Sequence, residues 1–197
     1  MIKRKNFRLL PLFLFLAYIA GAQNLDIRWL DKINSPPKPR ADKAWQFVSD
    51  CMAPVGVAMP LTLFAAGAIG KDENLRKRSY EAGGAFLLSA GLSMAIKVTV
   101  RRPRPFVTYP DIITRKSKGS GFSFPSGHTA VAFATATSLS ITYPKWYVIA
   151  PSFAYAGAVA YSRMYLGVHY PADLLGGIII GVGASLLSYQ VGRWIER

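Results

Sequence analysis

The sequence predicts an all-α fold, a polytopic transmembrane helical bundle with five core spans and an N-terminal signal peptide or signal-anchor helix. Apolar residues make up 51% of the 197 residues and the mean hydropathy is +0.22, values that are typical of membrane proteins. Five long apolar runs follow residue 50, and none of them alternates strictly between apolar and polar residues. Because lipid admits only helices and closed barrels, and barrel strands alternate, these runs are predicted to be helices.

Residues 1–22 begin with basic residues, continue in an apolar run from Leu9 and end on small residues, which is the pattern of a secretory signal peptide. The apolar run is short compared with the roughly 20 residues that cross a bilayer. A cleaved signal peptide is therefore favoured, and an uncleaved signal-anchor helix stays open. Both interpretations place the next segment outside the cytoplasm.

Residues 23–50 are predicted to be an extracytoplasmic segment, because they are polar and rich in proline. The stretch from Leu25 to Ile33 can form an amphipathic helix at the membrane interface, with Trp29 and Leu30 in the lipid. The remainder, residues 51–197, is predicted to be the membrane domain.

The five apolar runs of this domain are predicted to be transmembrane helices. They are Met52–Gly70, Ala82–Val100, His128–Tyr143, Trp146–Tyr165 and Pro171–Ile195. The basic loop 71–78 is predicted to be cytoplasmic, because positively charged loops stay inside. Alternation then places residues 101–127 and 166–170 outside. Residues 101–127 are basic as well, against that rule, and holding a phosphate would give their charges a function.

The formal net charge is +14, from 24 Lys and Arg residues against 10 Asp and Glu residues. The basic residues flank the apolar runs and form no single basic face, so nucleic-acid binding is not predicted. Contact with anionic membrane lipids accounts for most of the excess. Cys51 is the only cysteine, so an internal disulfide is excluded.

Both histidines of the chain lie in motifs that suit phosphate chemistry. The motifs are Lys97, six residues and Arg104-Pro105; Pro125-Ser126-Gly127-His128; and Ser162-Arg163, five residues, His169, three residues and Asp173. They are far apart in the sequence, yet the alternation of spans brings all three to one face of the membrane. Arg102 is interpreted equally as a snorkelling residue or a site residue, and Ser123 as a capping residue.

The local sequence supports a phosphate site. Ser126 precedes a predicted helix, so its hydroxyl can cap that helix, and N–H groups at a helix start can bind an anion. Gly127 permits close approach of the backbone to a ligand. His169 precedes the last predicted helix and Asp173 lies in its first turn. A carboxylate there can accept one imidazole N–H and fix which nitrogen faces the substrate.

These residues predict phosphate ester hydrolysis through a phosphohistidine. His169 is predicted to be the nucleophile, Asp173 to orient it, and His128 to protonate the leaving oxygen and then to activate water. The residues predicted to bind the phosphate are Lys97, Arg104, Ser126, Gly127 and Arg163. Because the chain has few acidic residues and no His/Cys cluster, neither a metal nor another cofactor is predicted.

The three motifs, in this order and spacing, resemble the signature of the type 2 phosphatidic acid phosphatase superfamily, the integral-membrane lipid phosphatases. The resemblance implies an all-helical bundle, usually with six spans, and a metal-free phosphohistidine route with the residue roles given above. Soluble acid phosphatases and vanadium haloperoxidases share this site, and the apolar runs argue against both.

The resemblance implies a lipid phosphate or pyrophosphate phosphatase. The compact size and the signal-like N-terminus predict a bacterial envelope enzyme of the inner membrane, and the alternation of spans places its site on the periplasmic face. Undecaprenyl pyrophosphate is the favoured substrate, and phosphatidylglycerol phosphate, phosphatidic acid and lipid A phosphate stay open. A lipid-to-lipid phosphotransferase and a non-enzymatic lipid transporter are the rival interpretations. The expected partners are the lipid phosphate substrate and membrane lipids, with no nucleic acid and no obligate protein partner.

Overall fold

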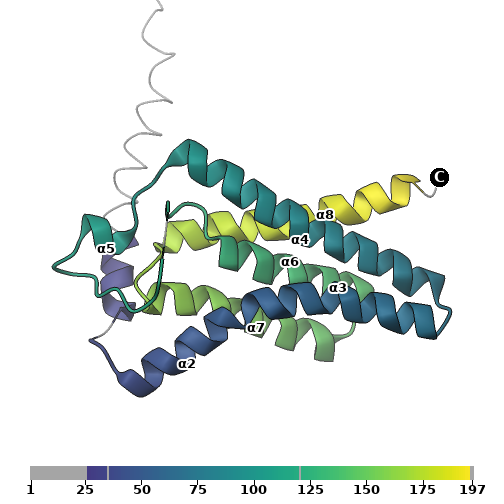
Figure 1. Cartoon of the computed structure of the whole chain (residues 1–197), viewed down its shortest axis with the longest axis horizontal. Coiled ribbons are helices and arrows are strands. Elements are labelled where there is room, and N and C mark those ends of the chain that lie inside the picture. Colours follow the sequence, from purple (N-terminus) through teal and green to yellow (C-terminus); the bar gives the residue numbers. More distant parts are fainter. Residues whose placement is uncertain (1–25, 35, 120, 196–197) are drawn as a thin grey trace, which may run out of the picture.

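The computed structural model describes residues 26–34, 36–119 and 121–195, and every regular element in these ranges is a helix (Figure 1). They are a helix at residues 26–33, α2 Pro39–Asp50, α3 Met52–Ile69, α4 Glu73–Val100, α5 Pro105–Thr108, α6 Gly127–Thr142, α7 Trp146–Tyr165 and α8 Pro171–Ile195. The predicted all-α class is therefore confirmed. The predicted signal segment, residues 1–22, lies outside the described residues.

Four of the five predicted runs agree with a helix to within a residue at each end, and α4 differs. It begins at Glu73, well before the predicted start at Ala82. The carboxylate of Asp72 caps it by accepting a hydrogen bond from the backbone N of Leu75 at 3.0 Å. The basic residues 76–78, predicted to lie in a loop, therefore lie in the first turns of α4. The apolar run could not show where α4 begins, because its first turns consist of charged residues, which also favour helix but do not raise the hydropathy.

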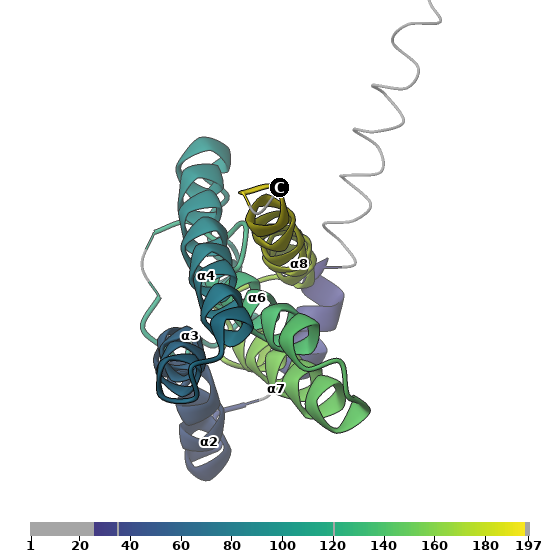
Figure 2. The same cartoon turned by 90° about the vertical axis from the view of Figure 1, so that its right-hand side faces the viewer.

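The central helix of the bundle is α6, which contacts α3, α4, α7 and α8 (Figure 2). Small residues let α8 approach it closely. A Cβ at Gly177 would lie 2.7 Å from the carbonyl oxygen of Ser126, and a Cβ at Gly181 would collide with the backbone of Ala130. Glycine at both positions therefore permits a packing distance that alanine would not. This contact brings the starts of α6 and α8 together, where two of the three motifs lie.

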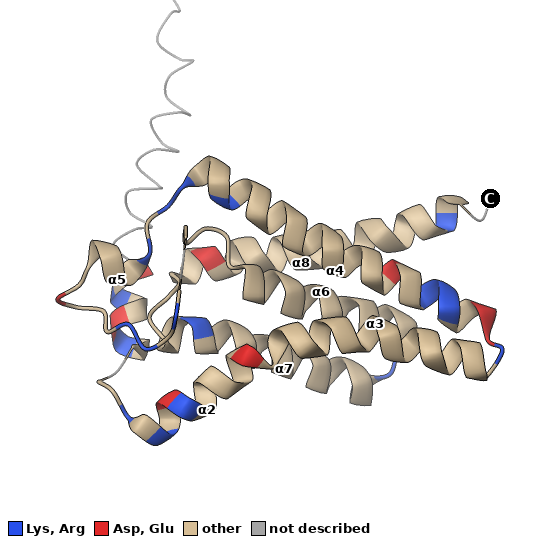
Figure 3. Ribbon diagram, viewed as in Figure 1, with Lys and Arg blue, Asp and Glu red and all other residues tan. Residues whose placement is uncertain are grey.

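Three stretches in the described part of the chain are long and apolar enough to cross a membrane: Pro39–Ile69, Glu73–Thr108 and Pro171–Ile195. α6 and α7 run alongside them (Figure 1). Charged residues gather near the two ends of the bundle, and the residues of its middle are mostly uncharged (Figure 3). This distribution is expected of a bundle that spans a bilayer. The number of five core spans stays a prediction.

The helix at residues 26–33 corrects one expectation. Leu30, predicted to lie in the lipid, is fully buried against Ile113 and Tyr170. Trp29, on the same helix, is 64% exposed. The chain itself therefore removes Leu30 from water, and the helix is fastened to the loops of the bundle.

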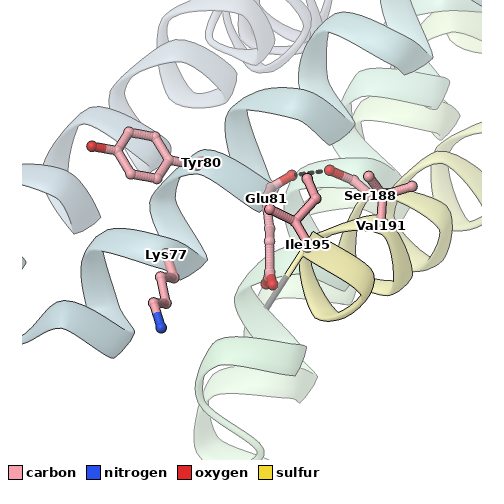
Figure 4. Close-up of a pocket in the computed structure, with 7 residues that line it drawn as sticks. Lys77, Tyr80, Glu81, Ser188, Val191 and Ile195 are labelled. Atoms are coloured by element: carbon pink, nitrogen blue, oxygen red, sulfur yellow. Dashed lines mark hydrogen bonds between the residues drawn. The ribbon is translucent and has the colours of Figure 1, made fainter. Parts of the chain in front are cut away.

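A cavity of about 310 Å³ lies between α4 and α8 (Figure 4). These parts of the two helices lie at the end of the bundle away from α5 (Figure 1). Its lining consists of Lys77, Tyr80, Glu81, Ser188, Val191, Gly192 and Ile195. The hydroxyl of Ser188 donates a hydrogen bond to the carbonyl oxygen of Glu81 at 2.7 Å and joins the two helices there. None of the predicted site residues lines this cavity, so it is separate from the predicted site.

Candidate active site

The imidazole of His169 and the carboxylate of Asp173 form a buried pair at the α5 end of the bundle. His169 lies in the loop between α7 and α8 and is 2% exposed, and Asp173 lies in the first turn of α8 and is fully buried. Nδ1 of His169 lies 3.3 Å from Oδ2 of Asp173. When Nδ1 carries the hydrogen and donates it in a hydrogen bond to the carboxylate, Nε2 is unprotonated and keeps its lone pair. The structure thus brings together the predicted nucleophile and its predicted orienting group.

The charge state of His169 suits a nucleophile. Burial lowers the pKa of His169 from 6.5 to about 4, although the hydrogen bond to Asp173 acts in the opposite direction. The ring is therefore neutral near pH 7, as nucleophilic attack requires. Nη1 of Arg104 lies 3.5 Å from Nε2. A positive charge is thus present where the oxygens of a phosphate would lie.

The carboxylate of Asp173 is fully used as an acceptor. Its donors are the imidazole of His169 at 3.3 Å, the backbone N of Tyr170 at 2.9 Å, the hydroxyl of Ser123 and Nη1 of Arg102 at 2.8 Å. The backbone carbonyl of Asp173 also accepts a hydrogen bond from the backbone N of Ser126 at 2.9 Å. Asp173 therefore joins the third motif to the second through its backbone, and its side chain bonds Ser123, which lies just before the second motif.

Arg102 belongs to this cluster. Besides Asp173, its guanidinium bonds Asp26 through Nη2 at 2.9 Å, and it lies 3.9 Å from the centroid of the Tyr170 ring. Asp26 in turn accepts a hydrogen bond from the backbone N of Ala172 at 3.0 Å, at the start of α8. Of the two interpretations of Arg102, the structure supports a place in the site over snorkelling.

Lys97 and Arg104, the cations of the first motif, hold the loops that carry the other motifs. Nζ of Lys97 donates to the carbonyl oxygens of residues 122 and 123 at 2.8 and 3.2 Å. Arg104, which is 7% exposed, donates to the carbonyl oxygens of residues 121 and 168 at 3.2 and 3.0 Å. An ammonium has three donors, so Lys97 keeps one for a ligand.

Ser126 and Gly127 form the start of α6. The fully buried Oγ of Ser126 accepts hydrogen bonds from the backbone N and Oγ1 of Thr129, at 3.4 and 2.9 Å, so its own hydrogen can point at an anion. Among the described residues, a Cβ at Gly127 would meet only Cβ of Ser93, at an ordinary 3.9 Å, and the φ of Gly127 is not positive. Neither packing nor strain requires glycine here, and close approach of a ligand to this backbone stays a prediction.

Arg163 and His128 line one cavity of about 470 Å³ on this side of the bundle. Arg163 is 3% exposed, and its Nη1 donates to the hydroxyl of Ser49 on α2. The charges of Arg163, Arg104 and Lys97 all act on the ring of His128. The predicted site residues therefore gather at one end of the bundle, as the alternation of spans predicted.

Residues 80–197, more than half of the chain, match the family model of the PAP2 superfamily. The chain belongs to the PAP2 superfamily. The resemblance drawn from the three motifs is thereby confirmed. The region that matches the PAP2 model contains all three motifs, and it does not include α2 or α3.

Two curated relatives and one solved structure illustrate the similarity. The chain is 34% identical over 106 residues to the undecaprenyl-diphosphatase of Sulfolobus acidocaldarius, covering 54% of this chain and 51% of that protein. It is 37% identical over 119 residues to the decaprenylphosphoryl-5-phosphoribose phosphatase of Mycolicibacterium smegmatis, covering 59% and 61%. The matches thus span between half and two thirds of these relatives. The crystal structure of Aquifex aeolicus LpxE has a TM-score of 0.73 at 28% identity and covers 84% of this chain and 95% of that one.

Three residues that sequence reasoning missed act on the PAP2 motifs. Ser123 lies close to the second motif, and its hydroxyl donates to Asp173 instead of serving as the predicted cap. Asp26 and Ser49 precede the region that matches the family model, and no spacing pointed to them. No group of three His, Cys, Asp or Glu residues that could hold a metal occurs in the described ranges. The metal-free route stays a prediction.

Proposed function

We propose that this PAP2 protein is a metal-independent phosphatase of lipid phosphates and diphosphates that works through a phosphohistidine. The observation that carries the proposal is the buried pair of His169 and Asp173, with Nε2 of the neutral imidazole beside Arg104. A neutral nitrogen that faces a fixed cation suits attack on an anionic phosphoryl group. The phosphatase names of two relatives support the same reaction class.

In the first step, Nε2 of His169 attacks phosphorus on the side opposite to the leaving oxygen. The N–P bond forms as the P–O bond breaks, and protonated His128 gives its proton to the leaving oxygen. Asp173 retains the Nδ1 hydrogen bond and stabilises the positive charge that the ring gains.

In the second step, His128 takes a proton from a water molecule whose oxygen attacks phosphorus. The N–P bond breaks, inorganic phosphate leaves and His169 is neutral again. The negative charge of the phosphoryl oxygens is balanced in both steps by Lys97, Arg104 and Arg163, with the Ser126 hydroxyl and the Gly127 N–H.

Undecaprenyl diphosphate at the periplasmic face of the inner membrane is the favoured substrate. A relative that is named undecaprenyl-diphosphatase supports this choice. The basic residues 71–78 lie at the end of the bundle opposite to the site (Figure 3). Because positively charged segments stay in the cytoplasm, this arrangement supports a site on the outer face.

The test uses the purified protein in detergent with undecaprenyl diphosphate and EDTA, and it measures released phosphate. The wild type should release phosphate, and His169→Ala should release none. Substrate labelled in the terminal phosphate should label the wild-type protein but not the His169→Ala protein. Lys145→Gln, at the opposite end of the bundle, is the matched control. No release by the wild type, or full release by His169→Ala, would refute the proposal, and a strict need for Mg²⁺ would refute the metal-free route.

A second candidate substrate class is a lipid-linked sugar phosphate. The relative from Mycolicibacterium smegmatis, whose name specifies a phosphoribose lipid, favours it. The same assay with a panel of the two lipid classes separates them by kcat/KM. A phosphotransferase would move the label into a second lipid in place of inorganic phosphate, and a transporter would release none.

A further inference from the structure

The cavity beside His128 is built largely from residues outside the three motifs. Its lining consists of Gln46 and Asp50 from α2, Lys116, Ser117 and Lys118 from the loop between α5 and α6, His128 from α6 and Arg163 from α7. α2 lies outside the region that matches the PAP2 model. A wall supplied by such an element is suited to choosing the substrate.

Unpaired polar atoms show what this cavity can bind. In the described part of the chain, six buried side-chain N or O atoms lack a hydrogen-bond partner. Three of the six line this one cavity: Oε1 of Gln46, Nζ of Lys116 and Nε of Arg163. Buried polar groups are nearly always hydrogen-bonded, so a group of unpaired atoms around one cavity indicates a polar ligand.

The charges on the cavity wall indicate whether that ligand is an anion or a cation. Lys116, Lys118 and Arg163 place three positive charges on the wall, against the carboxylate of Asp50 on the wall and that of Asp42, which lies 3.6 Å from Nζ of Lys116. Oδ1 of Asp50 already accepts a hydrogen bond from Nε2 of Gln46 at 2.6 Å. Two of the three unpaired atoms are cationic donors. Acceptor-rich anions satisfy such donors best, and phosphate is one of them.

The position of His128 places the anion relative to the reacting phosphorus. In the proposed reaction His128 protonates the leaving oxygen, and His128 lines this cavity. The group bonded to the leaving oxygen must therefore enter the cavity. In a lipid diphosphate that oxygen bridges the two phosphates, so the entering group is the second phosphate.

We propose that Lys116 holds the second phosphate of a lipid diphosphate while the first phosphate reacts at His169. This inference rests on the proposed function and adds a specificity-determining residue to it. In the reaction the bond from the bridging oxygen to the reacting phosphorus breaks, and its electron pair stays on that oxygen. The oxygen then takes the proton from His128, and the lipid monophosphate leaves with its charge paired to Lys116.

Lys116 is held in place for this contact. Its side chain is 3% exposed, and Nζ lies 3.6 Å from Oδ1 of Asp42 and 4.0 Å from the centroid of the Tyr165 ring. Its backbone N donates to the carbonyl oxygen of Leu166 at 3.1 Å. The side chain of Arg115 fastens the same loop by donating to the carbonyl oxygens of residues 117 and 119, at 3.0 and 3.2 Å. Positioning in advance reduces the entropy that binding a phosphate would cost.

The test compares farnesyl diphosphate with farnesyl phosphate, which share one chain and differ by one phosphate. For Lys116→Met, kcat/KM should fall at least about tenfold more with the diphosphate than with the monophosphate, because one charge-assisted contact is lost. Lys116→Arg keeps the charge and should restore most of the difference. Lys145→Met, at the far end of the bundle, should leave both values unchanged.

A binding measurement keeps the two proposals distinguishable. Inorganic diphosphate should raise the melting temperature of the wild type more than inorganic phosphate does, and Lys116→Met should remove that difference. If kcat/KM falls equally with both farnesyl substrates, or if the melting difference survives in Lys116→Met, the role of Lys116 is refuted. If the wild type hydrolyses neither farnesyl substrate nor undecaprenyl diphosphate, the proposed function is refuted, and the melting experiment still decides the diphosphate site.

Discussion

Replacing Asp173 with asparagine tests how the carboxylate controls His169. Asparagine has the same shape, but one of its two terminal atoms becomes an NH₂ donor. On the Oδ2 side, the NH₂ would face the backbone N–H of Tyr170 at 2.9 Å, and a backbone donor cannot turn away. On the Oδ1 side it would face Arg102, whose guanidinium can shift and keep its bond to Asp26. We therefore expect the amide oxygen to take the Oδ2 position.

With oxygen at Oδ2, the Nδ1–H of His169 keeps an acceptor, and the reactive tautomer is preserved. The change removes the negative charge and, with it, the hydrogen bond that Oδ1 accepts from Arg102. A hydrogen bond to a charged group contributes about 1.5–3 kcal/mol. Replacing the charged carboxylate with a neutral amide should therefore lower kcat by about 10- to 150-fold. The wrong tautomer would instead cost roughly 10⁴-fold.

The assay measures kcat for phosphate release by wild type, Asp173→Asn and His169→Ala in the same detergent, with a thermal melt of each. Asp173→Ala serves as a contrast, because it leaves several buried donors without an acceptor and should lower the melting temperature the most. If Asp173→Asn melts like the wild type and is as inactive as His169→Ala, our reasoning from the fixed N–H of Tyr170 is wrong.

Three further predictions follow from the geometry. His128→Gln leaves His169 as the only histidine, and NMR should show its ring neutral down to about pH 5, because its pKa in the folded protein is about 4. As the pH drops from about 6.5 towards 4, the unfolded protein binds a proton at this ring before the folded protein does, so the free energy of unfolding should fall. A pKa near 6.5 in the folded protein would contradict this. Gly177→Ala should lower the stability by about 1–3 kcal/mol in a melt through its 2.7 Å contact, whereas Gly183→Ala, with nothing within 4 Å, should not. Gly127→Ala should keep the melting temperature of the wild type but raise KM severalfold, and an unchanged KM would exclude close approach of phosphate to that backbone.

The sequence predicted the helices and the gathering of the three motifs because both depend on patterns along the chain. Apolar runs located the helices, and the alternation of spans placed the motifs at one end. The charged first turns of α4 were missed because hydropathy does not report them. Leu30 was misplaced because an amphipathic face packs equally well on lipid or on protein, and only the tertiary structure shows which.

The contacts that support the site could not be predicted from spacing. Asp26 reaches Arg102 from a helix 76 positions away, and Ser49 reaches Arg163 across 114 positions. Such pairs depend on how helices lie against each other, which no local pattern encodes. The lining of the cavity beside His128 is of the same kind, since α2 and the loop carrying Lys116 meet only in the folded chain.

The bonds that Asp173 makes to Arg102, Ser123 and Ser126 have a consequence for how this protein can diversify. Through its side chain and its carbonyl oxygen, Asp173 ties together residues of all three motifs, so a change in that block disturbs the reaction as a whole. α2 and residues 115–119 approach the block from outside, and their bonds to it are few: Ser49 bonds Arg163, and the backbone N of Lys116 bonds the carbonyl oxygen of Leu166. New headgroup preferences can therefore arise through substitutions in these two segments, while the bonded residues of the three motifs stay the same.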